Sequence, residues 1–381
     1  MKYDIIIAGG GPAGSAAAIT AARRGASVLL LERGRFPRNK VCGEFVSPES
    51  LSLLRWLLPD AVHVIEDAAA IGTVRLFIGK RLVKTEITPS AASITRFDLD
   101  SYLWSAAEKA GVDARSGVTV QHLGGKGPFT VETGAGDFEA WAVVDATGRW
   151  SNLKRATETA GTKWIGLKAH FVETQCNPSV DLYFFQGGYC GVQPVQFAGS
   201  DVPVLNACAM VRSDVARSLQ EVFAQHPALL ERSRNWKPVT ETVSTAPLVF
   251  SEPAPERNGI LCVGDAAGFI DPFLGDGISL ALHSGMLAAE CLQNFFEGSR
   301  GLATAIADYR NAYSEWLLPV FRRSARLRRV LALPELLLRW VLPFMEVGAV
   351  GRRVVNATRV RSAEMLESEN VAGWLSGSGI R

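Results

Sequence analysis

The stretch Ile5-Ile6-Ile7-Ala8-Gly9-Gly10-Gly11-Pro12-Ala13-Gly14 decides the fold of this chain. Its first four residues are apolar and have the length of a buried strand, and the residues from Ser15 to Arg24 predict an alanine-rich helix that ends at Gly25. A second apolar strand is predicted from Ser27 to Leu31, with Glu32 at its end. This order of strand, glycine turn, helix and strand is the pattern of a βαβ unit.

The three glycines of the G-x-G-x-x-G pattern each have a physical task. Gly9 permits a tight turn, Gly11 lets the backbone approach a pyrophosphate, and Gly14 lets the helix pack closely on the strand. The helix N-terminus carries about half a positive charge, which favours a diphosphate. Glu32 is placed to accept hydrogen bonds from a ribose diol. We therefore expect a dinucleotide here, and the fingerprint alone leaves FAD and NAD open.

Three later segments of the chain are predicted to belong to the same dinucleotide-binding domain. Residues 94–100 (Ile94-Thr95-Arg96-Phe97-Asp98-Leu99-Asp100) precede a helix predicted from Ser101 to Ala110. Residues 142–149 predict a strand that ends in a glycine turn, and residues 259–268 predict another strand, which ends at Gly264-Asp265. The order of these segments distinguishes between the two dinucleotides.

The whole arrangement, over about residues 1–300, resembles the large flavoprotein family that contains aromatic hydroxylases, flavin-dependent halogenases and geranylgeranyl reductases. The resemblance implies bound FAD, with Gly264-Asp265 on its ribityl chain and Arg96 beside it. It also implies that residues 271–278 run under the isoalloxazine ring and open a helix whose N-terminus faces the flavin N1/O2 edge. The predicted cofactor-binding residues are Gly9, Gly11, Pro12, Ala13, Gly14, Glu32, Arg33, Arg96, Val120, Gly264, Asp265, Pro272, Gly275, Gly277 and Ile278.

Within this family, two segments are most similar to geranylgeranyl reductase-like proteins. Residues 36–48 resemble their Lys-x-Cys-Gly-Gly/Glu-x-x-Ser-Pro signature, and residues 271–278 resemble their Pro-x-x-Gly-Glu-Gly-Ile stretch. The resemblance implies that Cys42 lies near flavin and substrate, where we hypothesise that it assists protonation of a substrate carbon; the alternative is a small packing residue in a turn. Thr147-Gly148 replaces the Asp-Gly pair usual in hydroxylases, and the W-x-W of tryptophan-type halogenases is absent from the sequence.

The middle of the chain predicts a substrate-binding sheet. Runs such as 73–78, 167–172 and 182–185 alternate in polarity, which indicates a mixed or antiparallel sheet with one face over the flavin. We expect an apolar substrate pocket lined by Tyr183, Phe185, Tyr189 and Pro194.

Three further residues of this region carry expectations of their own. The resemblance places Gly191 and Gln193 where the reductases often carry Trp and Phe, so the cavity is expected to be roomier and more polar. A polyketide-derived or aromatic metabolite is therefore an alternative to a long polyprenyl substrate. His170, a lone histidine in a strand, is expected to be structural.

The predicted fold class is α/β, a Rossmann-like FAD-binding domain of the GR2 type with an interleaved β-sheet substrate domain and a C-terminal helical region. The boundaries are 1–67, 94–162 and 251–300 for the FAD domain, 68–93 and 163–250 for the substrate domain, and 301–381 for the helical region. A net charge of +2 does not suggest a nucleic-acid partner, and six scattered cysteines support neither a metal site nor a disulfide framework.

The C-terminal region has an unusual charge pattern. Five arginines lie between residues 321 and 330, and the apolar stretch 333–350 follows them. We expect this region to cap a substrate tunnel or form a packing contact, and peripheral contact with an anionic membrane is the alternative. No run of about 18 apolar residues and no leader pattern is present, so a cytoplasmic location is expected. The oligomeric state stays open.

The expected function is reduction of a carbon–carbon double bond in a hydrophobic small molecule by hydride from flavin N5. The alternative is an FAD-dependent monooxygenase that hydroxylates or epoxidises through a C4a-hydroperoxide, with halogenation less favoured. A flavin-bound protein that binds a ligand without turnover is a third reading. Because no second glycine fingerprint follows, electrons are expected from transiently bound NAD(P)H or an external reductase.

Overall fold

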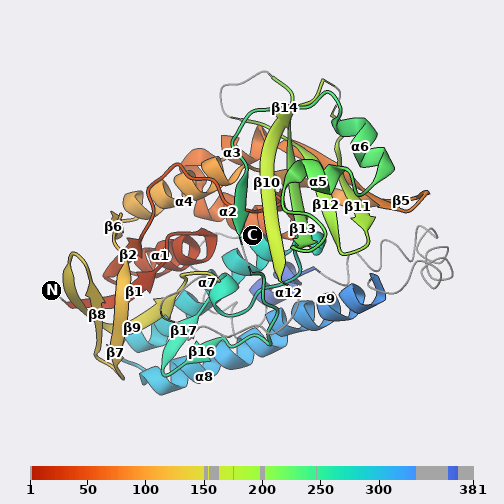
Figure 1. The fold of residues 1–381 in the computed structure, drawn as a ribbon. Coiled ribbons are helices and arrows are strands. Elements are labelled where there is room, and N and C mark those ends of the chain that lie inside the picture. The colour runs from red at the N-terminus through yellow and green to blue at the C-terminus, as the bar shows by residue number, and fades with distance from the viewer. Residues whose placement is uncertain are drawn as a thin grey trace.

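Two sheets and a set of helices form the computed structural model (Figure 1), which describes residues 2–149, 153, 163–174, 176–197, 202–245, 247–331 and 359–367. The strands of the first sheet lie at the left of the view and those of the second at the upper right. This mixed α/β architecture confirms the predicted fold class.

The first sheet is built around β1, whose apolar residues are buried on both faces as in other parallel sheets. Its strand order is β16-β17-β9-β1-β2-β6, in which β17, β9, β1, β2 and β6 are parallel, and a β7–β8 hairpin extends β9 antiparallel. The strands are β1 (Lys2–Ala8), β2 (Val28–Glu32), β6 (Asp113–Ser116), β7 (Val120–Gly125), β8 (Phe129–Thr133), β9 (Gly136–Asp145), β16 (Glu256–Arg257) and β17 (Ile260–Cys262).

The second sheet is mixed, as expected. Its order is β14-β10-β13-β12-β11-β4-β5-β3, with β15 also on β10; β11 and β4 are parallel and the other pairs are antiparallel. The strands are β3 (Phe45–Val46), β4 (Ala69–Ile78), β5 (Arg81–Ser93), β10 (Trp164–Val172), β11 (Ser179–Phe185), β12 (Gly188–Val195), β13 (Val204–Arg212), β14 (Lys237–Pro238) and β15 (Val243–Thr245).

Side chains alternate between the two faces of this second sheet, and each face has a different neighbour. One face is covered by α5 and α6, where Leu219, Phe223 and Leu229 complete a buried cluster. The opposite face turns toward the first sheet. This division decides which side chains can reach a ligand between the sheets.

Two helices begin earlier than the sequence pattern suggested. α1 starts at Pro12, a residue well suited to the first helical turn because it lacks an amide hydrogen. α4 starts at Arg96, because the side chain of Thr95 accepts a hydrogen bond from the amide of Asp98 and caps the helix. The helices are α1 (Pro12–Arg23), α2 (Pro48–Leu57), α3 (His63–Glu66), α4 (Arg96–Lys109), α5 (Leu219–Phe223), α6 (Pro227–Ser233), α7 (Gly277–Phe296), α8 (Leu302–Ala312), α9 (Leu318–Leu331) and α12 (Ser362–Glu367), with short helical turns η1 (Pro59–Ala61), η2 (Gly264–Ala266), η3 (Pro272–Leu274) and η4 (Tyr313–Leu317).

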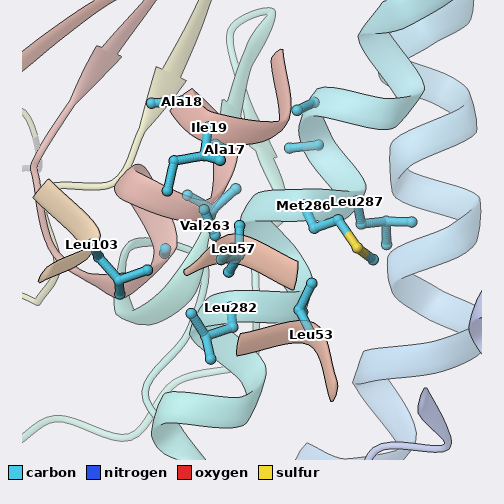
Figure 2. Close-up of a cluster of buried hydrophobic side chains, with 14 of the residues drawn as sticks. Ala17, Ala18, Ile19, Leu53, Leu57, Leu103, Val263, Leu282, Met286 and Leu287 are labelled. Atoms are coloured by element: carbon cyan, nitrogen blue, oxygen red, sulfur yellow. The ribbon is translucent and has the colours of Figure 1, made fainter. Parts of the chain in front are cut away.

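α1 and α7 form the centre of the largest hydrophobic core. A Cβ atom at Gly285 of α7 would lie 2.1 Å from the carbonyl oxygen of Ala13, so the two helices touch backbone to backbone. Figure 2 shows the apolar side chains that α1, α2, α4 and α7 contribute around this contact, namely Ala17, Ala18, Ile19, Leu53, Leu57, Leu103, Leu282, Met286 and Leu287, with Val263 from the segment after β17.

The end of the described chain returns to this core. Val360 and Met365 are buried in the same cluster as α7, and the Ser362 hydroxyl is hydrogen-bonded to His283 of α7. The apolar stretch 333–350 lies outside the described residues, so its predicted role stays a prediction. Among the residues that the structure describes, no helix is long and apolar enough to cross a membrane.

The close approach of α1 to β1 generates a stability prediction. A Cβ atom at Gly14 would lie 1.7 Å from the carbonyl oxygen of Gly9, so Gly14→Ala must push the helix off the strand. We expect the free energy of unfolding to fall by about 1–3 kcal/mol, the usual cost of overpacking. Urea denaturation measures it. Gly301→Ala is the matched control, because its Cβ meets no atom within 4 Å; equal unfolding midpoints for the two variants would contradict the packing argument.

Candidate active site

One cavity of about 600 Å³ lies between the two sheets. Its walls come from the β1–α1 turn, the segment between β2 and β3, the turns from β17 to α7, and the inward face of the second sheet. It therefore joins the glycine fingerprint to the predicted substrate sheet without an intervening layer.

At one end, the cavity is shaped to accept a diphosphate at the start of α1. Gly9 has a φ of 111°, in the region that glycine adopts without strain. A Cβ atom at Gly11 would meet only the guanidinium groups of Arg38 and Arg96, each at 3.9 Å, so the backbone there is open to the cavity. Open backbone between two guanidinium groups at a helix N-terminus suits a phosphate.

Glu32 lies at this end of the cavity, as the sequence suggested. Its carboxylate accepts hydrogen bonds from the amides of Gly10 and Gly34, both at 2.8 Å, and pairs with Arg38 at 2.6 Å. Burial raises the pKa of Glu32, but Arg38 and the two amides outweigh that effect and hold the pKa below its ordinary value. Glu32 is thus an ionised acceptor at the cavity wall.

Four cations line this end: Arg33, Arg38, Lys40 and Arg96. Burial lowers the pKa of Lys40 to about 8, and repulsion by Arg38, Arg96 and Arg33 adds to this effect while Glu32 opposes it. A bound dianion relieves such repulsion. These residues therefore fit the diphosphate of FAD. Arg38 and Lys40 were not in the predicted set, although both lie in the segment 36–48 that the sequence singled out.

The middle of the cavity is formed by the turns that lead into α7. Gly264, Asp265, Pro272, Gly275 and Gly277 line it. Asp265 pairs with Arg149 at 3.3 Å. α7 begins here, so its N-terminal amides open onto the cavity.

Cys42 lines the cavity beside a buried ionic cluster. Glu44 is fully buried with a φ of 62°, and its carboxylate accepts from Lys168, from the amide of Arg96 at 2.7 Å and from His170 Nε2 at 2.8 Å. Burial raises the pKa of Glu44, but Lys168 and His170 outweigh that effect and lower it.

The same cluster fixes the position of the cysteine. The Glu44 amide donates to Cys42 Sγ at 3.3 Å, and Asn206 Nδ2 donates to the Cys42 carbonyl at 2.9 Å. His170, bonded to Glu44 and Thr240, is a buried member of this cluster. Glu44 and Lys168 were not anticipated from the sequence.

Beyond Cys42, the inward face of the second sheet is mostly apolar. Val74, Val180, Leu182, Tyr189 and Met210 line this part of the cavity, together with Leu248, Phe269 and Phe273. The Tyr189 hydroxyl reaches Asp271 at 3.4 Å, and burial raises the pKa of Asp271 to about 6. Tyr189 therefore lies where the sequence placed it.

Tyr183, Phe185 and Pro194 do not line the cavity, which corrects their expected position. On β11, Leu182 and Val180 face inward, so the alternating Tyr183 and Phe185 face the opposite cluster under α5 and α6. Tyr183 stacks on Phe77 there and is bonded to Arg232.

The two positions expected to open the cavity, Gly191 and Gln193, do line it. A Cβ atom at Gly191 would lie 3.2 Å from Leu182, so that leucine occupies part of the space a larger residue would fill. Gln193 is buried and bonded to Ser93. The wall is therefore polar at Gln193, and Leu182 lies beside Gly191; that the cavity is roomier than in the reductases stays a prediction.

The cavity is lined by every predicted cofactor-binding residue except Gly14: Gly9, Gly11, Pro12, Ala13, Glu32, Arg33, Arg96, Val120, Gly264, Asp265, Pro272, Gly275, Gly277 and Ile278. Gly14 instead lets α1 pack on β1. Individual contacts with the cofactor stay predictions. Arg359, from the end of the described chain, also lines the cavity and had no signal in the sequence.

Comparison with known proteins shows which proteins this chain resembles. A family model described as FAD dependent oxidoreductase matches residues 4–37. Digeranylgeranylglycerophospholipid reductase 2 of Methanopyrus kandleri is 24% identical over 350 residues, which cover 87% of each chain. The flavin-dependent halogenase rdc2 of Metacordyceps chlamydosporia is 26% identical over 345 residues, which cover 77% of this chain and 65% of the halogenase, slightly less than two thirds of its length.

A solved structure has the same fold. The geranylgeranyl bacteriochlorophyll reductase-like protein from Thermoplasma acidophilum superposes with a TM-score of 0.72 at 20% identity, covering 99% of each chain. The family-model match and the curated relatives together identify the chain as an FAD-dependent oxidoreductase, and so an enzyme. Its relatives include both digeranylgeranylglycerophospholipid reductases and flavin-dependent halogenases, which confirms the predicted resemblance to the flavoprotein family that contains them.

The buried cluster beside Cys42 generates a second prediction. Lys168→Met leaves the Glu44 carboxylate buried with one cation fewer, so we expect the free energy of unfolding to fall by about 3–5 kcal/mol at pH 7. Adding Glu44→Gln removes the buried charge and should recover part of the loss. Because the pKa of Glu44 is lowered by folding, its contribution to stability is present above the unfolded pKa of about 4.3 and is lost as the pH falls through the folded value.

Lys237→Met is the matched control, because Lys237 is exposed on β14 beside β10. Denaturant unfolding of the wild type, Lys168→Met, Glu44→Gln and the double variant forms a double-mutant cycle, and Lys237→Met is measured beside it. A Lys168 variant no less stable than the Lys237 variant would show that the cluster contributes nothing.

Proposed function

We propose that this enzyme reduces a carbon–carbon double bond in a hydrophobic small molecule. The observation that carries the proposal is the continuity of one cavity, in which the diphosphate end, Cys42 and the apolar face of the second sheet follow one another. A cofactor and an apolar substrate can thus meet beside a thiol. The likeness to digeranylgeranylglycerophospholipid reductases supports a polyunsaturated lipid as the class of substrate.

In this proposal, three groups of residues would bind three parts of FAD. Gly11 and the cations Arg38, Lys40 and Arg96 would hold the diphosphate, Glu32 the adenosine ribose, and Asp265 the ribityl chain. FAD supplies a hydride when bound and reduced. NAD(P)H that binds transiently, or a reductase partner, supplies the electrons in this proposal.

Cys42 completes the reduction in this scheme. Hydride addition to one carbon of the double bond requires a proton on the other, and the Cys42 thiol is the acid at the cavity wall that supplies it. The Arg96 guanidinium, in contact with Cys42, stabilises the thiolate that remains. Solvent then returns the proton. Leu182, Met210 and Phe273 exclude water from the apolar end.

Anaerobic turnover tests the proposal. The FAD-loaded enzyme is reduced with dithionite without oxygen and mixed with digeranylgeranylglycerophospholipid in detergent micelles. We expect the absorbance of oxidised flavin to return, and the lipid to gain two hydrogens per reduced double bond by mass spectrometry. If flavin reoxidises only after oxygen is admitted, the proposal is wrong. A product that then carries oxygen or a halogen identifies the oxygen-dependent alternative. The likeness to a flavin-dependent halogenase is the reason to test for it.

The role of Cys42 has its own prediction. Cys42→Ala should lower the rate of product formation about 10²–10⁴-fold, the usual contribution of a positioned acid, while the visible spectrum of bound FAD is unchanged. Cys176→Ser is the matched control, because its thiol lies outside the cavity, hydrogen-bonded to the Glu173 carbonyl. Turnover in Cys42→Ala equal to that of the control would remove the cysteine from the mechanism.

A further inference from the structure

Arg359 enters the cavity from a part of the chain far from every other wall residue in sequence. It lies in the segment that leads into α12, which begins at Ser362, yet its side chain lines the cavity together with Gly275 and Gly277 at the start of α7. Its guanidinium donates to Asp276 Oδ1 at 2.7 Å and lies over the ring of Phe45, 5.1 Å from its centroid. A single residue near the end of the described chain thus brings a positive charge to the N-terminus of α7.

The tail holds this arginine in place through its own packing. Val360 and Met365 are buried in the core cluster that contains residues of α7. The Ser362 hydroxyl is hydrogen-bonded to His283, which lies in the N-terminal half of α7. The guanidinium is therefore held by its hydrogen bond to Asp276, and the backbone that carries it is held by the buried residues that follow. Because it is held in this way, the Arg359 guanidinium has a fixed position relative to a ligand bound in the cavity.

Asp276 has an uncommon environment for a carboxylate. It is fully buried directly before the first residue of α7, and its Oδ2 has no hydrogen-bond partner among the described residues. Burial raises the pKa of Asp276 to about 7, Arg359 opposes that rise, and the nearby Glu49 adds to it. Asp276 itself does not line the cavity, so Arg359 is the nearer of the two charges to a ligand.

We propose that Arg359 sets the reduction potential of the bound FAD by stabilising the negative charge of the reduced ring. The ring gains two electrons and one proton on reduction, so its net charge falls by one. A fixed cation at the cavity wall and the amides of the α7 N-terminus both favour the charged form. The inference rests on the proposed position of FAD in this cavity, with its ring at the start of α7, and not on the reaction that follows.

The charge argument predicts opposite effects for the two members of the pair. Arg359→Met removes the cation and should lower the potential, whereas Asp276→Asn removes its counter-charge and should raise it. Each change should alter the ratio of affinities for reduced and oxidised FAD about tenfold, which corresponds to about 30 mV for two electrons. The double variant should return toward the wild-type value. A purely structural role of the pair would move both single variants in the same direction, because both break the same ion pair.

The experiment is an anaerobic titration of each FAD-loaded variant with dithionite against a reference dye at pH 8, where Asp276 is mostly ionised. No substrate is present, so the result does not depend on the proposed reaction. Arg361→Met is the control, because Arg361 lies in the same segment but is exposed, paired with Glu364 at 2.7 Å. Its potential should equal that of the wild type.

Arg359→Lys keeps the charge and should stay close to the wild-type potential even if Arg359→Met binds FAD poorly. Equal potentials in Arg359→Met and Arg361→Met, or shifts of the same sign in Arg359→Met and Asp276→Asn, overturn the inference. A chain that takes up no FAD at all gives no flavin signal, and that outcome refutes the proposed cofactor site rather than the role of Arg359.

Discussion

The close contact between α1 and α7 is the constraint on which the site depends. Gly285 lies so near the Ala13 carbonyl that no larger residue fits between the helices. Because the two helices are held together there, both of their N-termini open onto the same cavity. One end then suits the diphosphate of a dinucleotide and the other suits a ring that becomes negative on reduction. The second sheet supplies the remaining wall, and its inward face supplies the apolar part.

Charge is distributed along this cavity in a consistent way. The diphosphate end gathers cations that repel one another, and this repulsion lowers the pKa of Lys40 together with burial. The middle is lined by the ion pair of Arg149 with Asp265 and by Glu44, whose partner Lys168 is buried. The far end is mostly apolar, with Gln193 and the Tyr189 hydroxyl, which is hydrogen-bonded to Asp271, as polar exceptions. A ligand that is anionic at one end and apolar at the other matches this order, which agrees with a flavin dinucleotide followed by a hydrophobic substrate.

Sequence identified the lining of the dinucleotide half of the cavity, because the positive φ of Gly9 and the lack of space for a Cβ atom at Gly14 leave a recognisable glycine pattern. It misplaced Tyr183 and Phe185, because alternation gives two faces but does not say which face a helix will cover; α5 and α6 decide that. It also could not anticipate Arg359, whose position depends on a tail that returns to α7 over a long distance in the chain. Glu44 and Lys168 are far apart in sequence, and only the fold brings them together.

The most direct test of this account is the affinity of the purified, flavin-free protein for FAD. Titration with FAD, followed by the visible spectrum and by flavin fluorescence, should show saturable binding of one FAD per chain, and denaturation should release FAD unchanged. Failure to take up FAD even in large excess would contradict the central claim, that the cavity between the two sheets is built around this cofactor.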